Sequence, residues 1–92
     1  MRIEHDQEKN KFEAYDDSGA RMGEIAYVPR RGALSANHTW VSDEFRGRGV
    51  AGKLLDALVA FAVAGDLKII PICSYVASAF EKNPERYREV ME

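Results

Sequence analysis

Hydrophobic and polar positions alternate along the first forty residues of the chain, as they do in strands of a half-buried sheet. The turn-forming stretches "DDSG" and "PRRG" and the polar stretch "QEKN" separate the alternating segments. In the last segment, alternation places Leu34, Ala36, His38 and Trp40 on one face. The pattern predicts an antiparallel meander of four strands, over residues 2–6, 11–16, 21–28 and 33–41.

The period then changes to three or four residues. Apolar residues follow this spacing from Val50 to Ala64, and Gly65 supplies a stop signal, so this segment predicts an amphipathic helix. Its apolar positions are Val50, Leu54, Leu55, Leu58, Phe61 and Ala62. We expect that face to pack on the sheet.

A continuous apolar run, "LKIIPICSYV", follows the helix. Its composition is typical of a buried central strand, and Pro71 should interrupt the hydrogen-bond ladder of that strand. Residues 74–83 predict a second, shorter helix that ends before Pro84, and "PERYREVM" adds one more turn. The element order β-β-β-β-α-β-α indicates an α+β fold.

Length and composition limit the classes of protein. The 92 residues fit a single domain, 1–92, and 46% hydrophobic residues suffice for a packed core. The net charge of −2 gives no indication of a nucleic-acid or membrane partner, and no apolar run is long enough to span a bilayer. The single cysteine excludes an internal disulfide. We therefore expect a cytoplasmic monomer or weak dimer, with no metal site.

The segment "RGRGVA", residues 46–51, places two glycines at the start of the predicted helix. Free backbone N–H groups and the helix dipole make such a start favourable for an anion, which Gly47 and Gly49 would allow to approach. Arg46 and Arg48 would add charge-assisted donors, and Lys53 could reach an outer phosphate. The spacing matches neither common nucleotide-binding glycine motif. A solvated turn or an RNA-contacting arginine pair remains an alternative.

Three motifs in order, "HTWV" (38–41), "RGRGVA" (46–51) and "PICSYV" (71–76), resemble those of the minimal GNAT-like N-acetyltransferases. The resemblance covers nearly the whole chain and implies a mixed, mostly antiparallel GNAT-like sheet. It also implies that the loop binds the pyrophosphate of coenzyme A, with Val41, Val50 and Ala51 in the cofactor site. The implied activity is acetyl-CoA-dependent N-acetylation of an unidentified small-molecule or peptide amine.

Two departures from the GNAT pattern stand out. Trp40 occupies the position between threonine and valine where the minimal members usually carry an acidic residue, which changes what lies beside the acyl group. The minimal subgroup also lacks the N-terminal helices that build much of the acceptor pocket in ordinary GNAT enzymes. The identity of the acceptor therefore does not follow from the resemblance.

Two residues are candidates for catalysis. His38 is the natural general base by type, although a half-buried histidine on a strand can serve only as a hydrogen-bonded structural residue. Cys73 lies where the resemblance places the pantetheine arm of coenzyme A, and it is either an acyl carrier, a neighbour of the thioester, or inert packing. Tyr75 and Ser74 could protonate the departing thiolate, although a tyrosine facing the core is equally compatible with the pattern.

Two other functions compete with acetyl transfer. A coenzyme A-binding module without turnover would account for the missing acceptor-site helices. An RNA-binding domain would use the arginines Arg30, Arg31, Arg46 and Arg48, with Trp40 or Tyr27 for base stacking. The acidic balance of the chain argues against the RNA-binding function.

Overall fold

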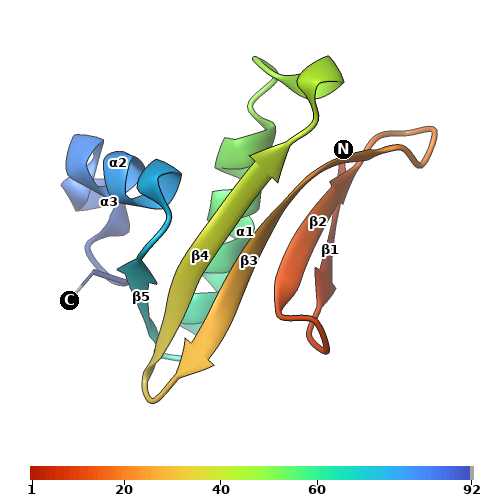
Figure 1. Cartoon of the computed structure of the whole chain (residues 1–92). Coiled ribbons are helices and arrows are strands. Elements are labelled where there is room, and N and C mark those ends of the chain that lie inside the picture. The colour runs from red at the N-terminus through yellow and green to blue at the C-terminus, as the bar shows by residue number, and fades with distance from the viewer. Residues whose placement is uncertain (92) are drawn as a thin grey trace.

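A computed structural model describes residues 1–91 of the chain as a five-stranded sheet with helices on one side (Figure 1). The strands lie in the order β1-β2-β3-β4-β5; the first four pair antiparallel and β5 pairs parallel to β4. The strands span Arg2–Asp6 (β1), Lys11–Tyr15 (β2), Arg21–Arg30 (β3), Ala33–Val41 (β4) and Lys68–Pro71 (β5). The helices span Asp43–Phe45 (η1, a 3-10 turn), Val50–Ala64 (α1), Ser74–Lys82 (α2) and Pro84–Tyr87 (α3). The predicted α+β order is confirmed.

The turns between the first four strands follow the turn chemistry of the sequence. The Asp16 carboxylate accepts hydrogen bonds from the backbone N–H groups of Ser18 and Ala20, both at 2.9 Å, as expected for the "DDSG" turn. The prediction for "PRRG" is too long, because β3 continues through Pro29 to Arg30 and only Arg31 and Gly32 form the turn. Pro29 is tolerated there because β3 at this point extends beyond its pairing with β2.

Strand β4 contains a β-bulge at Asn37. Ala26 of β3 pairs with His38 and the next residue, Tyr27, pairs with Ala36, so Asn37 is the extra residue on β4. The bulge reverses the alternation of sides beyond it. The prediction that His38 and Trp40 share the face of Leu34 and Ala36 is therefore wrong: Leu34 and Ala36 are buried, while His38 and Trp40 are exposed.

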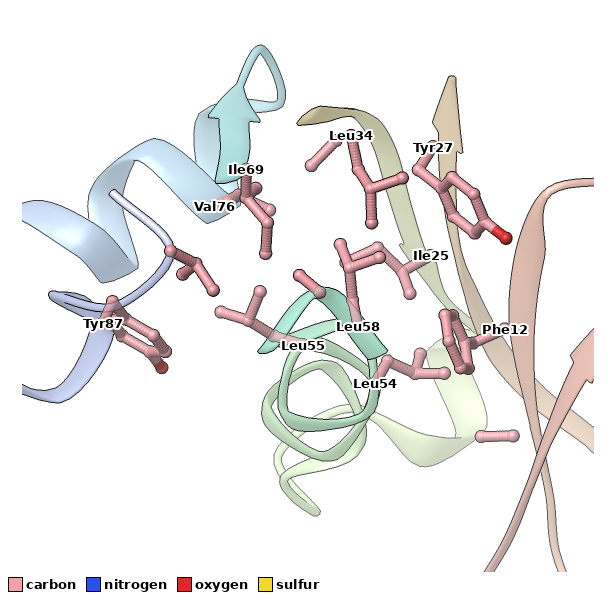
Figure 2. Close-up of a cluster of buried hydrophobic side chains, with 14 of the residues drawn as sticks. Phe12, Ile25, Tyr27, Leu34, Leu54, Leu55, Leu58, Ile69, Val76 and Tyr87 are labelled. Carbon is pink, nitrogen blue, oxygen red and sulfur yellow. The ribbon is translucent and has the colours of Figure 1, made fainter. Parts of the chain in front are cut away.

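Helix α1 covers one face of the sheet and supplies the centre of the core. Its predicted bounds are confirmed, and Val50, Leu54, Leu55, Leu58 and Ala62 are buried. Figure 2 shows Leu54 and Leu58 directed at side chains from the sheet, among them Phe12 and Ile25. Burial of an apolar side chain of this size stabilises the fold by about 1.5–3 kcal/mol. The apolar stripe of the helix thus fixes α1 on the sheet.

Strand β5 is an edge strand, and the prediction of a central strand is wrong. Its sequence is apolar because the chain's last described residues cover its outer edge, where the Ile69 N–H donates to the Val90 carbonyl at 2.7 Å. The Lys68 Nζ also donates to the Glu89 carbonyl at 2.9 Å. Ile69 and Val90 are both buried. The strand ends at Pro71, where a proline was expected to interrupt the ladder.

Helices α2 and α3 follow β5 and pack beside α1. Val76 of α2 and Tyr87 of α3 join the core (Figure 2). Phe80 of α2 also belongs to it. An ion pair of 2.8 Å between Arg86 and Asp56 connects α3 to α1 at the surface. Among the helices described for residues 1–91, none is both long and apolar enough to cross a membrane.

Candidate functional site

The sheet opens between β4 and β5, and this opening, which we call the split, is the centre of the candidate site. The last paired residues are Ala36 and Pro71, and the Cys73 N–H donates to the Ala36 carbonyl at 2.7 Å. Beyond this point β4 continues to Val41, while the chain after β5 turns away into α2 (Figure 1). One wall of the split is therefore the free length of β4, and the other is the first turn of α2.

The glycine loop lies at the same end of β4 and opens helix α1. Gly47 and Gly49 have φ angles of 80° and 75°, a left-handed conformation that side chains other than glycine rarely adopt. Gly49 is the N-cap of α1, and no side chain among residues 1–91 caps the first turn. A Cβ added at either glycine would meet no atom of the described part of the chain within 4 Å. The first amides of α1 are thus uncapped by side chains and lie next to open space, as an anion site requires.

A hollow of about 270 Å³ lies against this loop. It contains six of the eight residues predicted from the sequence to bind the cofactor, namely Val41, Arg46, Gly47, Gly49, Val50 and Ala51. Phe45, Gly52 and Tyr75 complete the lining. The hollow therefore joins the end of β4, the glycine loop and the first turn of α2.

The other two predicted cofactor residues, Arg48 and Lys53, lie outside the hollow. The Arg48 guanidinium stacks over the Phe45 ring at 5.4 Å, a cation–π contact. Arg46 at the rim is paired with Asp43 at 3.0 Å, and both side chains are highly exposed. Exposed ion pairs contribute little and rearrange easily, so these arginines can reorient towards a ligand.

Sequence reasoning missed Phe45 and Gly52 as lining residues. Gly52 is the third glycine of the run "GRGVAG", and a Cβ at this position would lie 3.9 Å from the Tyr75 hydroxyl. The third glycine was therefore the available signal for a close neighbour in the first turn of the helix. Phe45 carried no signal beyond an isolated aromatic residue in a polar stretch, because its burial depends on the η1 turn.

Cys73 lies at the N-cap of α2, on the far side of the split from β4. Its Sγ lies 3.4 Å from Thr39 Oγ1, and the two groups are hydrogen-bonded. Burial raises the pKa of the thiol, but the Thr39 hydroxyl and the backbone N–H groups of Val76 and Tyr75 outweigh it, so the pKa of Cys73 is lowered. A lowered pKa increases the thiolate fraction at neutral pH, which is the nucleophilic form.

Tyr75 lies one residue into α2 and lines the hollow together with the glycine loop. Its side chain is partly exposed, so the alternative in which it faces the core does not hold. Burial is the main reason why the pKa of Tyr75 is raised, and the neighbouring Tyr87 and Asp56 raise it further. The hydroxyl therefore keeps its proton at neutral pH and can act as a proton donor.

His38 lies on the open face of the sheet, opposite α1. Normal alternation beyond the bulge places it on the opposite side of β4 from Thr39, whose pairing partner Ile25 belongs to the core beneath α1. The Nε2 atom of His38 lies 3.8 Å from the Glu24 carboxylate, and just over half of the His38 side chain is exposed. The structure thus brings Cys73 and the glycine loop to the split from the α1 side, and places His38 on the other side of β4.

Comparisons with known proteins agree with this arrangement. A family model of the GCN5-related N-acetyl-transferases matches residues 11–90. Protein NATD1 of Xenopus tropicalis and of Homo sapiens is each 34% identical over 88 residues, which cover 91% of this chain and 78% and 75% of those proteins.

Two solved structures are also similar. The solution structure of a GCN5-like candidate N-acetyltransferase from Staphylococcus aureus has a TM-score of 0.78 and 37% identity, covering 99% of this chain and 87% of that one. A ribosomal-protein-alanine N-acetyltransferase from Brucella melitensis has a TM-score of 0.60 at 23% identity, covering 78% and 59%. This second likeness extends to the fold alone.

Proposed function

The chain belongs to the GCN5-related N-acetyltransferase family, and from that premise we propose that it is an acetyl-CoA-dependent N-acetyltransferase. The observation that carries the proposal is the shared hollow between the glycine loop and α2. An uncapped helix start with two left-handed glycines suits a pyrophosphate, and the split that continues from it suits a long thin arm. Cys73 stands where such an arm would present its thioester.

The residues that would bind acetyl-CoA follow from this arrangement. The amides that follow Gly49 would donate to the pyrophosphate, and Arg46 at the rim would add a charge-assisted hydrogen bond. Arg48 and Lys53 stand farther out and would contribute through long-range attraction. Val41 and Tyr75 would flank the arm as it passes from the loop into the split.

Cys73 is proposed as the acyl carrier. Its thiolate attacks the carbonyl carbon of the thioester, so that a bond from Sγ to that carbon forms while the bond from carbon to the sulfur of coenzyme A breaks. Tyr75 donates a proton to the leaving thiolate and regains one from solvent. The acceptor amine then attacks acetyl-Cys73, a carbon–nitrogen bond forms, and the Cys73 thiolate leaves. One proton of the amine is released, so the products are the acetamide and coenzyme A.

Intact-protein mass spectrometry after incubation with acetyl-CoA tests the proposal. We expect an increase of about 42 Da, the acetyl increment of a covalent intermediate, which hydroxylamine reverses and which peptide mapping places on Cys73. The variant Cys73→Ser should show no such adduct. If acetylation of an amine persists in Cys73→Ser, the proposal of an N-acetyltransferase stands, but Cys73 is not the acyl carrier.

Calorimetric titration with acetyl-CoA decides between an enzyme and a binding module. Binding together with acetylated product, across a panel of alkyl and peptide amines, supports the proposal. Binding with no product from any amine would contradict the proposed enzyme activity and would indicate a coenzyme A-binding module. An absence of binding would overturn both.

A further inference from the structure

One hydroxyl group, that of Thr39, stands next to the thiol of Cys73 inside the split. The Cys73 thiol donates a hydrogen bond to Thr39 Oγ1, with 3.4 Å between the sulfur and the oxygen. Both side chains are partly buried. A hydroxyl oxygen is a nucleophile as well as a hydrogen-bond acceptor, and the transfer to an amine proposed above places no acyl group on it.

Backbone contacts hold these two side chains in position from opposite walls of the split. Thr39 belongs to β4, where it pairs with Ile25 of β3, and its β-branched side chain has few rotamers. The Cys73 N–H donates to the Ala36 carbonyl at 2.7 Å. The Cys73 carbonyl accepts from the Ala77 N–H at 3.0 Å. The separation between Sγ and Oγ1 is therefore fixed by the sheet and by the first turn of α2.

Acetylation of Cys73 would turn this hydrogen bond into a reactive contact. In acetyl-Cys73 the carbonyl carbon is bonded to Sγ, and the S–H group that donates to Thr39 Oγ1 is gone. Rotation about the bond from Cβ to Sγ can then bring the carbonyl carbon to about 3–3.5 Å from Oγ1. Intramolecular attack starts from this separation, and the rigid placement of both groups favours it strongly over attack by a hydroxyl in solution.

We propose that Thr39 is a self-acetylation site, which takes the acetyl group from Cys73 when no amine is present. This inference rests on the proposed function, because acetyl-Cys73 is the donor. Thr39 Oγ1 attacks the carbonyl carbon, so that a bond from Oγ1 to that carbon forms while the bond from carbon to Sγ breaks. The hydroxyl proton passes to the departing sulfur. The products are acetyl-Thr39 and the Cys73 thiol, and no further reactant takes part.

The two leaving groups make this transfer slow but hard to reverse. The Thr39 hydroxyl is un-ionised at neutral pH and attacks more slowly than a neutral amine, so an acceptor amine takes the acetyl group first. Return of the acetyl group to Cys73 would expel an alkoxide, which is a much poorer leaving group than a thiolate. Acetyl-Thr39 therefore accumulates when no amine is available. It also lacks the hydroxyl proton that stabilises the Cys73 thiolate, so the modified protein takes up further acetyl groups more slowly.

Hydroxylamine distinguishes an acetyl group on sulfur from one on oxygen. The protein is incubated for several hours with acetyl-CoA and no amine, then denatured and treated with hydroxylamine at neutral pH, which cleaves thioesters and leaves oxygen esters intact. We expect a resistant mass increase of about 42 Da, the acetyl increment. Alkaline hydroxylamine should remove it, as it would not remove an acetylated lysine, and peptide mapping should place it on Thr39.

Variants at the two positions separate the two steps. Thr39→Val keeps the shape of the side chain without the hydroxyl, so it should still form the hydroxylamine-sensitive adduct on Cys73 but lose the resistant adduct by about tenfold or more. Thr39→Ser should retain the resistant adduct. Cys73→Ala keeps the Thr39 hydroxyl and removes the donor, so the resistant adduct should be lost. Ser74→Ala is the matched control, because it removes the exposed hydroxyl next to Cys73 in the sequence, and the resistant adduct should persist. Thermal melts confirm that each variant is folded.

Three results would overturn the inference and leave the proposed function in place. The first is a hydroxylamine-sensitive adduct on Cys73 without any resistant adduct. The second is a resistant adduct that maps to Ser74 or elsewhere and not to Thr39. The third is acetyl-Thr39 in Cys73→Ala, since the acetyl group would then come directly from acetyl-CoA. If neither adduct forms, Cys73 is not an acyl carrier, and the carrier step fails together with the self-acetylation.

Discussion

The sulfur of Cys73 and the hydroxyl of Thr39 lie 3.4 Å apart across the split between β4 and α2. This hydrogen bond joins two segments that are far apart in the sequence, and it exists because the bulge at Asn37 turns Thr39 towards α1. The hydroxyl stabilises the thiolate more than the thiol. The reactivity of Cys73 is therefore controlled by a residue on the sheet.

The first prediction concerns the pH at which Cys73 ionises. Because the pKa of the folded thiol is lowered, the rate of alkylation by iodoacetamide should reach half its maximum at a lower pH in the folded protein than in the unfolded one. Thr39→Val removes the hydroxyl and should move this midpoint to higher pH. Thr39→Ser keeps the hydroxyl and should leave it nearly unchanged. Coinciding midpoints for Thr39→Val and the parent would contradict the role of Thr39.

The second prediction separates coenzyme A binding from backbone strain. Gly49 and Gly32 have φ angles of 75° and 73°, and a Cβ at either would meet no atom within 4 Å. Substitution by alanine should therefore lower the free energy of unfolding by a similar amount at both positions, about 1–2 kcal/mol. Only Gly49→Ala should also weaken the binding of coenzyme A, by about ten- to a hundredfold, because the added Cβ would enter the space of the pyrophosphate and hold it away from the amides that donate charge-assisted hydrogen bonds. Calorimetry and thermal melts of the two variants measure both effects, and equal affinities would count against the phosphate loop.

The third prediction tests how α1 packs. Leu58 is fully buried against the sheet, so Leu58→Ala should lower the free energy of unfolding by about 2–5 kcal/mol. Val63 lies on the same helix but is 43% exposed, and Val63→Ala should cost less than about 1 kcal/mol. Urea denaturation compares the two. A loss below about 0.5 kcal/mol for Leu58→Ala would show that the buried face of α1 is assigned wrongly.

The fourth prediction concerns stability in mild acid. His5 stacks on Phe12 at 4.0 Å between ring centres, and its Nε2 lies 2.6 Å from the Tyr27 hydroxyl. Burial lowers the pKa of His5, with Asp6 opposing the shift. The unfolded chain therefore binds a proton more readily than the folded one.

The stability that His5 contributes should be complete above about pH 6.5, the ordinary pKa of histidine, and should be lost as the pH falls through the lower folded value. Urea denaturation of the parent and of His5→Gln at pH 5 and pH 8 measures the difference. The parent should lose more stability than the variant between these pH values. Equal losses would assign the acid sensitivity to other groups.

Much of the fold could be predicted because its signals are local. The helix from Val50 to Ala64 shows its period within fifteen residues and its stop at the next residue, Gly65, and the turn at Asp16 shows its own chemistry. The edge position of β5 could not be predicted, because its apolar character depends on Val90, which closes the outer edge from the far end of the chain.

The part of the candidate site that is contiguous in the sequence could likewise be predicted. The glycine loop is a contiguous segment, and most of its residues line the hollow. The surroundings of His38 were not predictable, since a single unpaired residue at Asn37 changes the side to which every later residue of β4 points. Alternation alone carries no sign of a bulge, because the extra residue resembles any other polar position in a strand.

The bulge at Asn37 also separates the sides of β4 from the numbering of its residues. An in-frame loss of the Asn37 codon would remove the extra residue and leave a regular ladder, with Thr39 still on the α1 side and His38 and Trp40 still on the open side. In a relative that lacks one residue of this strand, a gap at position 37 therefore compares residues of the same side, whereas a gap placed after Trp40 would compare Thr39 with a residue of the open side. Alignments of the family should accordingly be anchored on the bulge.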